Sequence, residues 1–148
     1  MELLEREDVV GVGEGFWQDV LRCEPNFPAL AAAALKIRKS VEGHAAGCRS
    51  EKLNAYLDHG VSSCHESVNM EEVLEKLRLG ICVMIREGSG RKDLEAIAGI
   101  KDMPIDFRRL ALVSDSIDLG YLMEKGYMES IVQRAIDLGF DPIVAIQM

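Results

Sequence analysis

Short apolar runs alternate with amphipathic segments along this chain. In the segment 60–89, an apolar entry at Val61 ends in a polar cluster at 62–67, and apolar residues then recur at helical spacing across 70–79. Gly80 follows the last of these residues, at the position where helices usually end. Residues 81–85 form an unbroken apolar run, which is typical of a parallel strand buried on both faces. The segment therefore predicts a strand, a helix and a second strand, with polar side chains at the end of each strand.

The same rhythm continues on both sides of this segment. It predicts further strands at 9–13, 40–44 and 109–113, and helices at 29–39, 51–59, 91–98, within 126–139 and at 142–147. Ser50 is placed to cap the helix at 51–59, and Gly60 to end it. Strands that alternate with helices in this way predict an α/β fold with a parallel sheet.

The number of these units bears on domain organisation. About five βα units are expected in the 148 residues, whereas a closed TIM-type barrel needs eight. Residues 2–8 resemble the end of a helix, and residues 145–148 fall where the last helix has barely begun. We therefore expect residues 1–148 to be one partial domain, a fragment or a truncated reading frame of a longer α/β protein.

The composition is that of a globular chain, with 48% hydrophobic and 28% charged residues. The longest apolar stretch, 29–35, is far shorter than the roughly 20 residues that span a bilayer. The N-terminus is acidic where a signal peptide would be basic, and the net charge of −8 argues against binding to a nucleic acid backbone. No CxxC spacing is present, so we expect four reduced thiols in a cytoplasmic protein, namely Cys23, Cys48, Cys64 and Cys82.

Residues able to carry chemistry follow the predicted strands. Four strand ends supply Glu14, His44, His65 and Asp115, and another supplies Arg86 and Glu87. Because the C-terminal ends of parallel strands converge on one rim, these side chains are expected to meet there. Imidazole and carboxylate ligands suit zinc, iron or manganese better than copper(I). A hydrolytic site of this kind uses the ion to lower the pKa of a bound water to about 7, with a carboxylate nearby to move the proton.

The spacing alone does not separate ligands from ordinary turn residues, since a single histidine or aspartate after a strand is more often a cap. Six segments carry a more specific pattern: VGVGEG at 10–15, VEGHAAG at 41–47, LNAYLDHGVSSCHES at 53–67, EEVLEKLRLGICVMIREGS at 71–89, LALVSDS at 110–116 and GFDPIVAIQM at 139–148. In this order and spacing they resemble the adenine deaminases of the amidohydrolase superfamily. The resemblance covers nearly the whole chain. It implies a metal-dependent hydrolase of purine metabolism that converts adenine to hypoxanthine and ammonia, on an incomplete (β/α)8 TIM-type barrel that represents the C-terminal half of the catalytic barrel.

The resemblance also implies roles for individual residues. The metal ligands would be Glu14, His44, His65 and Asp115. Asp115 would carry the proton, with Glu66 and His65 as further catalytic residues, and Arg86 and Ser89 would lie near the purine. For Arg86, a structural salt bridge with Glu87 is an equal alternative. The implied cofactor is a divalent metal, manganese or iron ahead of zinc, the substrate is a small purine, and we expect a homo-oligomer.

The chain also departs from the family pattern. The paired His-x-His of the family's first strand has no counterpart, because the three histidines stand at 44, 59 and 65. We expect His59 to be a solvated or capping residue at a helix end. The chain alone would then bind one metal weakly. Two alternatives remain open: a different amidohydrolase that acts on a cyclic amide, or a catalytically inactive fragment that serves as a binding or association module.

Overall fold

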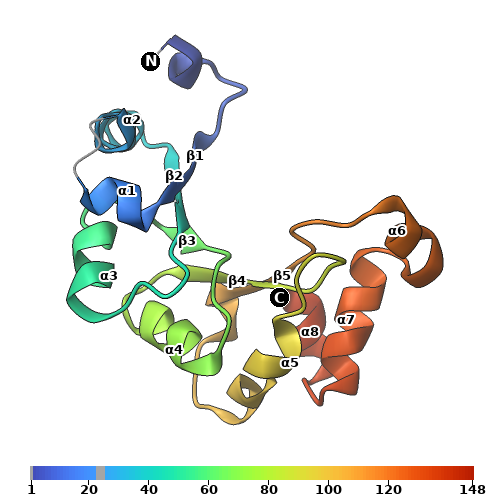
Figure 1. Cartoon of the computed structure of the whole chain (residues 1–148). Coiled ribbons are helices and arrows are strands. Elements are labelled where there is room, and N and C mark those ends of the chain that lie inside the picture. The colour runs from blue at the N-terminus through green and yellow to red at the C-terminus, as the bar shows by residue number, and fades with distance from the viewer. Residues whose placement is uncertain (1, 23–25) are drawn as a thin grey trace. The chain divides into compact units, whose positions relative to one another are not determined.

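The computed structural model describes residues 2–22 and 26–148 (Figure 1). These residues form two compact units, the first running to Cys64 and the second from His65 to Met148. Cys23, one of the four predicted thiols, lies outside the described residues. No helix in the described part of the chain has both the length and the apolar character that a membrane span requires.

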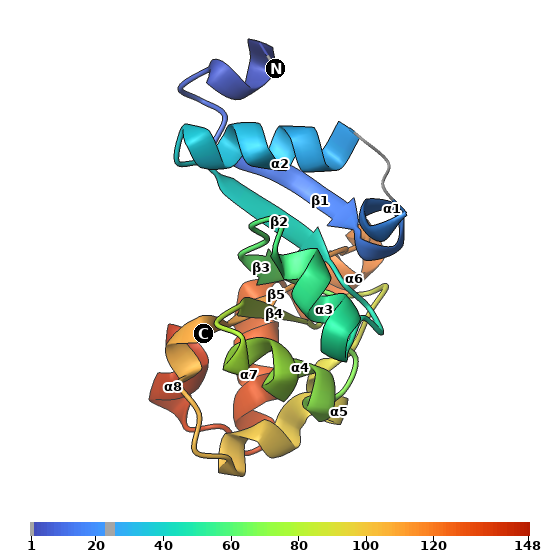
Figure 2. The ribbon, with the colours of Figure 1, turned by 90° about the vertical axis from the view of Figure 1, so that its left-hand side faces the viewer.

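The first unit is built on three parallel strands. They are β1 (Gly11–Phe16), β2 (Ser40–His44) and β3 (Ser63–Cys64), with β2 paired to both of the others. A short 3-10 helix η1 (Glu2–Glu5) precedes them, and three α-helices accompany them: α1 (Trp17–Leu21), α2 (Asn26–Lys36) and α3 (Ser50–Leu57). Figure 2 shows α2 lying along β1 and β2.

Small side chains allow this close approach of helix and sheet. Ala31 and Ala34 on α2 are buried, as is Val41 in the middle of β2. The third helix, α3, buries Leu53 and Tyr56, which are three residues apart and therefore share one face of the helix. The core of the first unit thus lies between the strands and one face of each of these helices.

The second unit contains two parallel strands, β4 (Cys82–Arg86) and β5 (Leu110–Val113), paired from Val83 with Leu110 to Arg86 with Val113. Helix α4 (Met70–Arg78) precedes β4, and α5 (Leu94–Ile97) continues into the 3-10 helix η2 (Ala98–Asp102). After the short η3 (Phe107–Arg109) and β5 come α6 (Leu119–Lys125), α7 (Met128–Asp137) and α8 (Pro142–Gln147). Helices α4 and α5 pack on β4, α7 packs on β5, and α8 packs on α7 (Figure 1).

The predicted α/β character and the parallel pairing of strands are confirmed. Three local features differ from the predicted ones. β1 begins at Gly11 and extends to Phe16, so Glu14 lies inside a strand and not after one. β3 contains only two residues and falls within the polar cluster itself. The predicted cap, Ser50, is wrong: Arg49 occupies the N-cap position, while Ser50 is the first helical residue and has a left-handed φ of 55°.

Among the α-helices of the described residues, two were not predicted, α1 and α6. Helix α1 has five residues, and only Val20 is buried. Helix α6 has no buried residue among its seven, and its apolar residues at helical spacing, Leu119, Leu122 and Met123, are all exposed. The closure of a (β/α)8 barrel remains a prediction.

Candidate functional site

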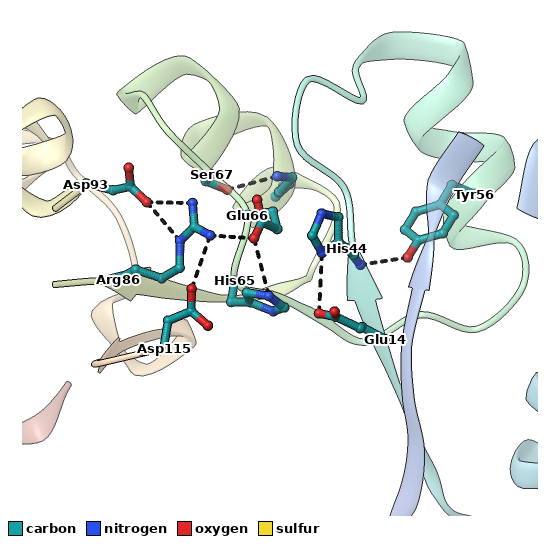
Figure 3. A network of polar contacts seen from close by, with 10 residues as sticks. Glu14, His44, Tyr56, His65, Glu66, Ser67, Arg86, Asp93 and Asp115 are labelled. Atoms are coloured by element: carbon teal, nitrogen blue, oxygen red, sulfur yellow. Dashed lines mark hydrogen bonds and ion pairs between the residues drawn. The ribbon is translucent and has the colours of Figure 1, made fainter. Parts of the chain in front are cut away.

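In the first unit, two of the predicted metal ligands lie together. β1 and β2 are in register at Gly15 with Gly43 and at Phe16 with His44, which places Glu14 beside the end of β2. The carboxylate Oε2 of Glu14 lies 3.3 Å from Nδ1 of His44 (Figure 3). The His44 ring is also in contact with the ring of Phe16, at 4.0 Å between centroids. The imidazole is therefore held from two directions.

This pair fits a divalent metal ion. A carboxylate oxygen and an imidazole nitrogen bound to one ion at about 2.0–2.2 Å lie roughly 3.0–3.5 Å apart. The separation of 3.3 Å between Glu14 and His44 falls in that range. The two side chains are 41% and 20% exposed, respectively, so an ion can reach them without unfolding the unit. Mixed nitrogen and oxygen donors suit manganese, iron and zinc alike.

A buried tyrosine fixes the two strands beside this pair. The Tyr56 hydroxyl donates to the carbonyl oxygen of Gly15 and accepts from the backbone N–H of His44 at 2.9 Å. Burial raises the pKa of Tyr56, so the hydroxyl keeps its proton. Gly43 makes this approach possible, because a Cβ there would meet Val61, the Ser63 carbonyl and the Tyr56 hydroxyl. The sequence analysis missed Tyr56, although its spacing of three from Leu53 on a predicted helix marks it as a residue of the buried face.

The second unit begins with His65, which directly follows the last residue of β3. His65 Nε2 lies 3.4 Å from Oε1 of Glu66, and that oxygen also accepts a hydrogen bond from Nη1 of Arg86 (Figure 3). Nη1 of Arg86 makes a second ion pair, with Oδ2 of Asp115 at 3.3 Å. Four of the predicted site residues are therefore linked within this unit.

Arg86 has a further partner, Asp93, which the sequence analysis did not identify. Oδ2 of Asp93 lies 2.9 Å from Nε of Arg86 and 2.8 Å from Nη2. The Arg86 side chain is 2% exposed. Among the described residues, Arg86 makes ion pairs with Glu66, Asp93 and Asp115, and not with Glu87, which was the predicted alternative. No regular spacing in the sequence marks Asp93, because the loop after β4 decides where it lies.

A second buried cation holds the segment that carries His65 and Glu66. Lys76, on α4, is 1% exposed, donates to Oγ of Ser67 at 2.9 Å, and lies 3.8 Å from Glu72. The sequence analysis did not single out Lys76, which stands between the apolar positions of the predicted helix. Its place one turn after Glu72 and three residues after the buried Val73 could have indicated that it shares the inner face of the helix.

Asp115 follows β5 and has a left-handed φ of 57°, which aspartate and asparagine tolerate better than most residues. It lines a hollow of about 340 Å³ together with Ser114, Ile117, Leu122 and Tyr127. Ser89, another predicted site residue, makes hydrogen bonds to the loop that contains Asp115. Oγ of Ser89 donates to the Ser116 carbonyl at 3.2 Å and accepts from the Asp118 N–H at 2.9 Å. The loops after β4 and β5 are thus joined.

Glu87, which ends the polar tip of β4, is buried, and its Oε2 accepts from the Leu94 N–H at 3.4 Å. Desolvation raises the pKa of its carboxyl group. Glu87 therefore takes a structural position at the start of α5. The meeting of Glu14, His44, His65 and Asp115 on one rim remains a prediction. Within the first unit Glu14 lies beside His44, and within the second unit Glu66 and Arg86 link His65 to Asp115.

The sequence is similar to those of known enzymes. The chain is 43% identical over 149 residues to an adenine deaminase of Staphylothermus marinus, covering 99% of this chain and 25% of that protein. It is 40% identical over 154 residues to an adenine deaminase of Archaeoglobus fulgidus, with the same shares of the two chains. The chain is homologous to about a quarter of an adenine deaminase. A third such enzyme, from Cenarchaeum symbiosum, is 41% identical over 143 residues, which is 95% of this chain and 24% of that one.

The resemblance to adenine deaminases stated from the motifs is thus confirmed, and so is the expectation that the chain is partial relative to them. The chain spans about a quarter of the length of the adenine deaminases that it matches. No family model matches the sequence.

Proposed function

We propose that this chain supplies part of the active site of a metal-dependent hydrolase that converts adenine to hypoxanthine and ammonia. The similarity to a quarter of several adenine deaminases carries the proposal. The pairing of Glu14 with His44 supports it independently, because the two donor atoms have the separation that one divalent ion requires. On this proposal the parallel strands of both units belong to a (β/α)8 barrel.

Glu14, His44, His65 and Asp115 would hold the metal. A divalent ion in this position supplies a Lewis acid and lowers the pKa of a water. Manganese and iron suit the donor set, as does zinc. The metal's identity, the homo-oligomeric state and the cytoplasmic location stay predictions.

Asp115 would move the proton during the reaction. Arg86 donates to Oδ2 of Asp115, so we assign the proton transfer to Oδ1. Oδ1 would take a proton from the attacking water and then give it to the leaving amino nitrogen. Ile117, Leu122 and Tyr127 line the hollow beside Asp115, and their apolar surfaces suit the face of a purine ring. Glu66, next to His65, would orient that imidazole through its contact of 3.4 Å.

The histidines provide a direct test of the metal site. Calorimetric titration of the 148-residue chain with Mn²⁺ should show one site, and H44A, H65A and E14Q should each weaken binding about tenfold or more, since each removes a ligand. H59A is the matched control, because His59 follows α3 and is no part of the proposed ligand set. Equal losses in H44A, H65A and H59A, or no binding by the wild-type chain, would contradict the metal site.

The activity itself is tested in a chimera. The matching quarter of the Staphylothermus marinus enzyme is replaced by this chain, and ammonia release from adenine is followed. The chimera should retain deamination, and D115N in it should lose about 10²-fold or more, because asparagine keeps the left-handed backbone but cannot take the proton. A folded chimera that binds metal and opens a dihydropyrimidine ring, while leaving adenine intact, would favour the cyclic amide alternative. A folded, metal-free, inactive chimera would favour the association module.

A further inference from the structure

One guanidinium group in the second unit lies among three carboxylates from three separate segments. Arg86 ends β4, and its partners are Glu66 after β3, Asp93 before α5 and Asp115 after β5. The Arg86 side chain is 2% exposed, and those of Glu66 and Asp93 are 9% and 12% exposed. Figure 3 shows these side chains pointing toward the guanidinium. A charge buried this deeply needs paired acids, and here it has more than one.

The nitrogens of the guanidinium group contact different carboxylates. Nε and Nη2 both face Oδ2 of Asp93, at 2.9 Å and 2.8 Å. Nη1 faces Glu66 Oε1 and, at 3.3 Å, Asp115 Oδ2. Nε and Nη1 donate hydrogen bonds to carboxylates of the chain itself, whereas Nη2 is buried beside Asp93 without a hydrogen bond. This arrangement differs from an arginine that presents a fork of donors to a ligand.

We infer that Arg86 is a positioning residue, which holds the Glu66 and Asp115 carboxylates together by sharing Nη1 between them, and is not a substrate contact. The inference rests on the proposed function, in which both carboxylates act. Two carboxylates that approach one another repel, and the shared cation offsets that repulsion. Asp93 anchors the opposite edge of the guanidinium, so the position of Nη1 is set by β4 and by the loop that follows it.

A lysine at this position cannot do the same. It would keep the charge and offer three donors from a single atom, but it lacks the planar fork that reaches Asp93 and both other acids at once. Arg86→Lys therefore keeps the positive charge and removes the planar arrangement of donors. The pair of Arg108 with Asp106, at 2.8 Å on the surface of the same unit, offers a matched control, because Arg108→Lys makes the same chemical change where nothing is positioned.

The experiment follows the side-chain carboxyl carbons of Glu66 and Asp115 by NMR in the full 148-residue chain without metal. In R86K both resonances should shift, while R108K should leave them unchanged. Asp93→Asn keeps the guanidinium group and weakens only its anchor, so it should lower the unfolding midpoint in urea and shift the two resonances less than R86K does. Unchanged resonances in R86K, or equal shifts in R86K and D93N, would overturn the inference, because Arg86 would then only fill the core.

The metal-binding titration gives a second readout that separates this inference from the proposed function. If Arg86 positions Asp115 and, through Glu66, His65, then R86K should weaken Mn²⁺ binding about 10- to 100-fold, as loss of an outer partner of a ligand does. R108K should not change it. A wild-type chain that binds no Mn²⁺ contradicts the proposed function, whereas the carboxyl resonances still decide the role of Arg86. Wild-type affinity retained in R86K would contradict the positioning role.

Discussion

At the scale of single residues, Tyr56 contributes to the site without touching any ligand atom. Its hydroxyl joins the Gly15 carbonyl of β1 to the His44 N–H of β2, and it does so from a side chain that is fully buried. Both backbone groups lie one residue from, or at, a proposed metal ligand. The position of Glu14 relative to His44 therefore depends on a hydrogen bond that water cannot replace.

Tyr56→Phe should lower the free energy of unfolding by about 1–3 kcal/mol, because it leaves a buried donor and a buried acceptor without their partner. Urea denaturation followed by circular dichroism measures the change. Tyr127→Phe is the control, since Tyr127 is 49% exposed and its hydroxyl can bind water. If Y56F were as stable as Y127F, the hydroxyl would not be holding the two strands.

At the scale of elements, α4 connects the segment at 65–67 to β4, and its first turn is capped. Oδ1 of Asn69 accepts from the Glu72 N–H at 3.0 Å, and Nδ2 of Asn69 donates to Oε1 of Glu72 at 3.2 Å. The spacing of three residues is that of a capping box, and the sequence contained this signal. Lys76 on the same helix then reaches back to Ser67. The start of α4 thus fixes the residues that follow His65.

Asn69→Ala should destabilise the chain by about 1 kcal/mol, because the N–H of Glu72 loses its acceptor at the helix start. Asn54→Ala is the matched control: Asn54 is exposed in the interior of α3, where alanine is the better helix former. Thermal melting of the two variants measures the difference. Equal melting temperatures in N69A and N54A would show that the cap adds nothing to the stability of α4.

Regular patterns predicted some elements well and others poorly. The strand at 40–44 and the helix at 70–79 agree with β2 and α4 to within a residue, although the residues that α4 buries are Glu72, Val73 and Lys76 and not its leucines. The two-residue β3 is too short to carry a pattern, and α6 buries none of its residues. The proximity of Glu14 to His44 follows from parallel pairing alone. The partners of Arg86 depend on loop paths, which periodicity does not encode.

At the scale of the whole molecule, the negative net charge lowers the stability of the folded state. The 148 residues carry 25 acidic and 17 basic side chains, for a net charge of −8. Repulsion of this kind acts over the whole surface and destabilises the folded chain. The exposed ion pairs, such as Arg6 with Asp8 and Arg108 with Asp106, are worth little in water. The buried contacts of Arg86 and Lys76 are shielded from salt by their burial.

Sodium chloride should therefore raise the free energy of unfolding. Between about 10 mM and 100 mM salt the Debye length falls from roughly 30 Å to 10 Å, which screens the long-range repulsion but reaches the buried pairs much less. Urea denaturation at the two salt concentrations measures the effect, and sucrose at matched osmolality controls for exclusion of solute from the surface. R86K should show the same salt-dependent gain as wild type, because its charge is unchanged. A loss of stability with salt would mean that attractive ion pairs, and not the net charge of −8, dominate the electrostatics of this chain.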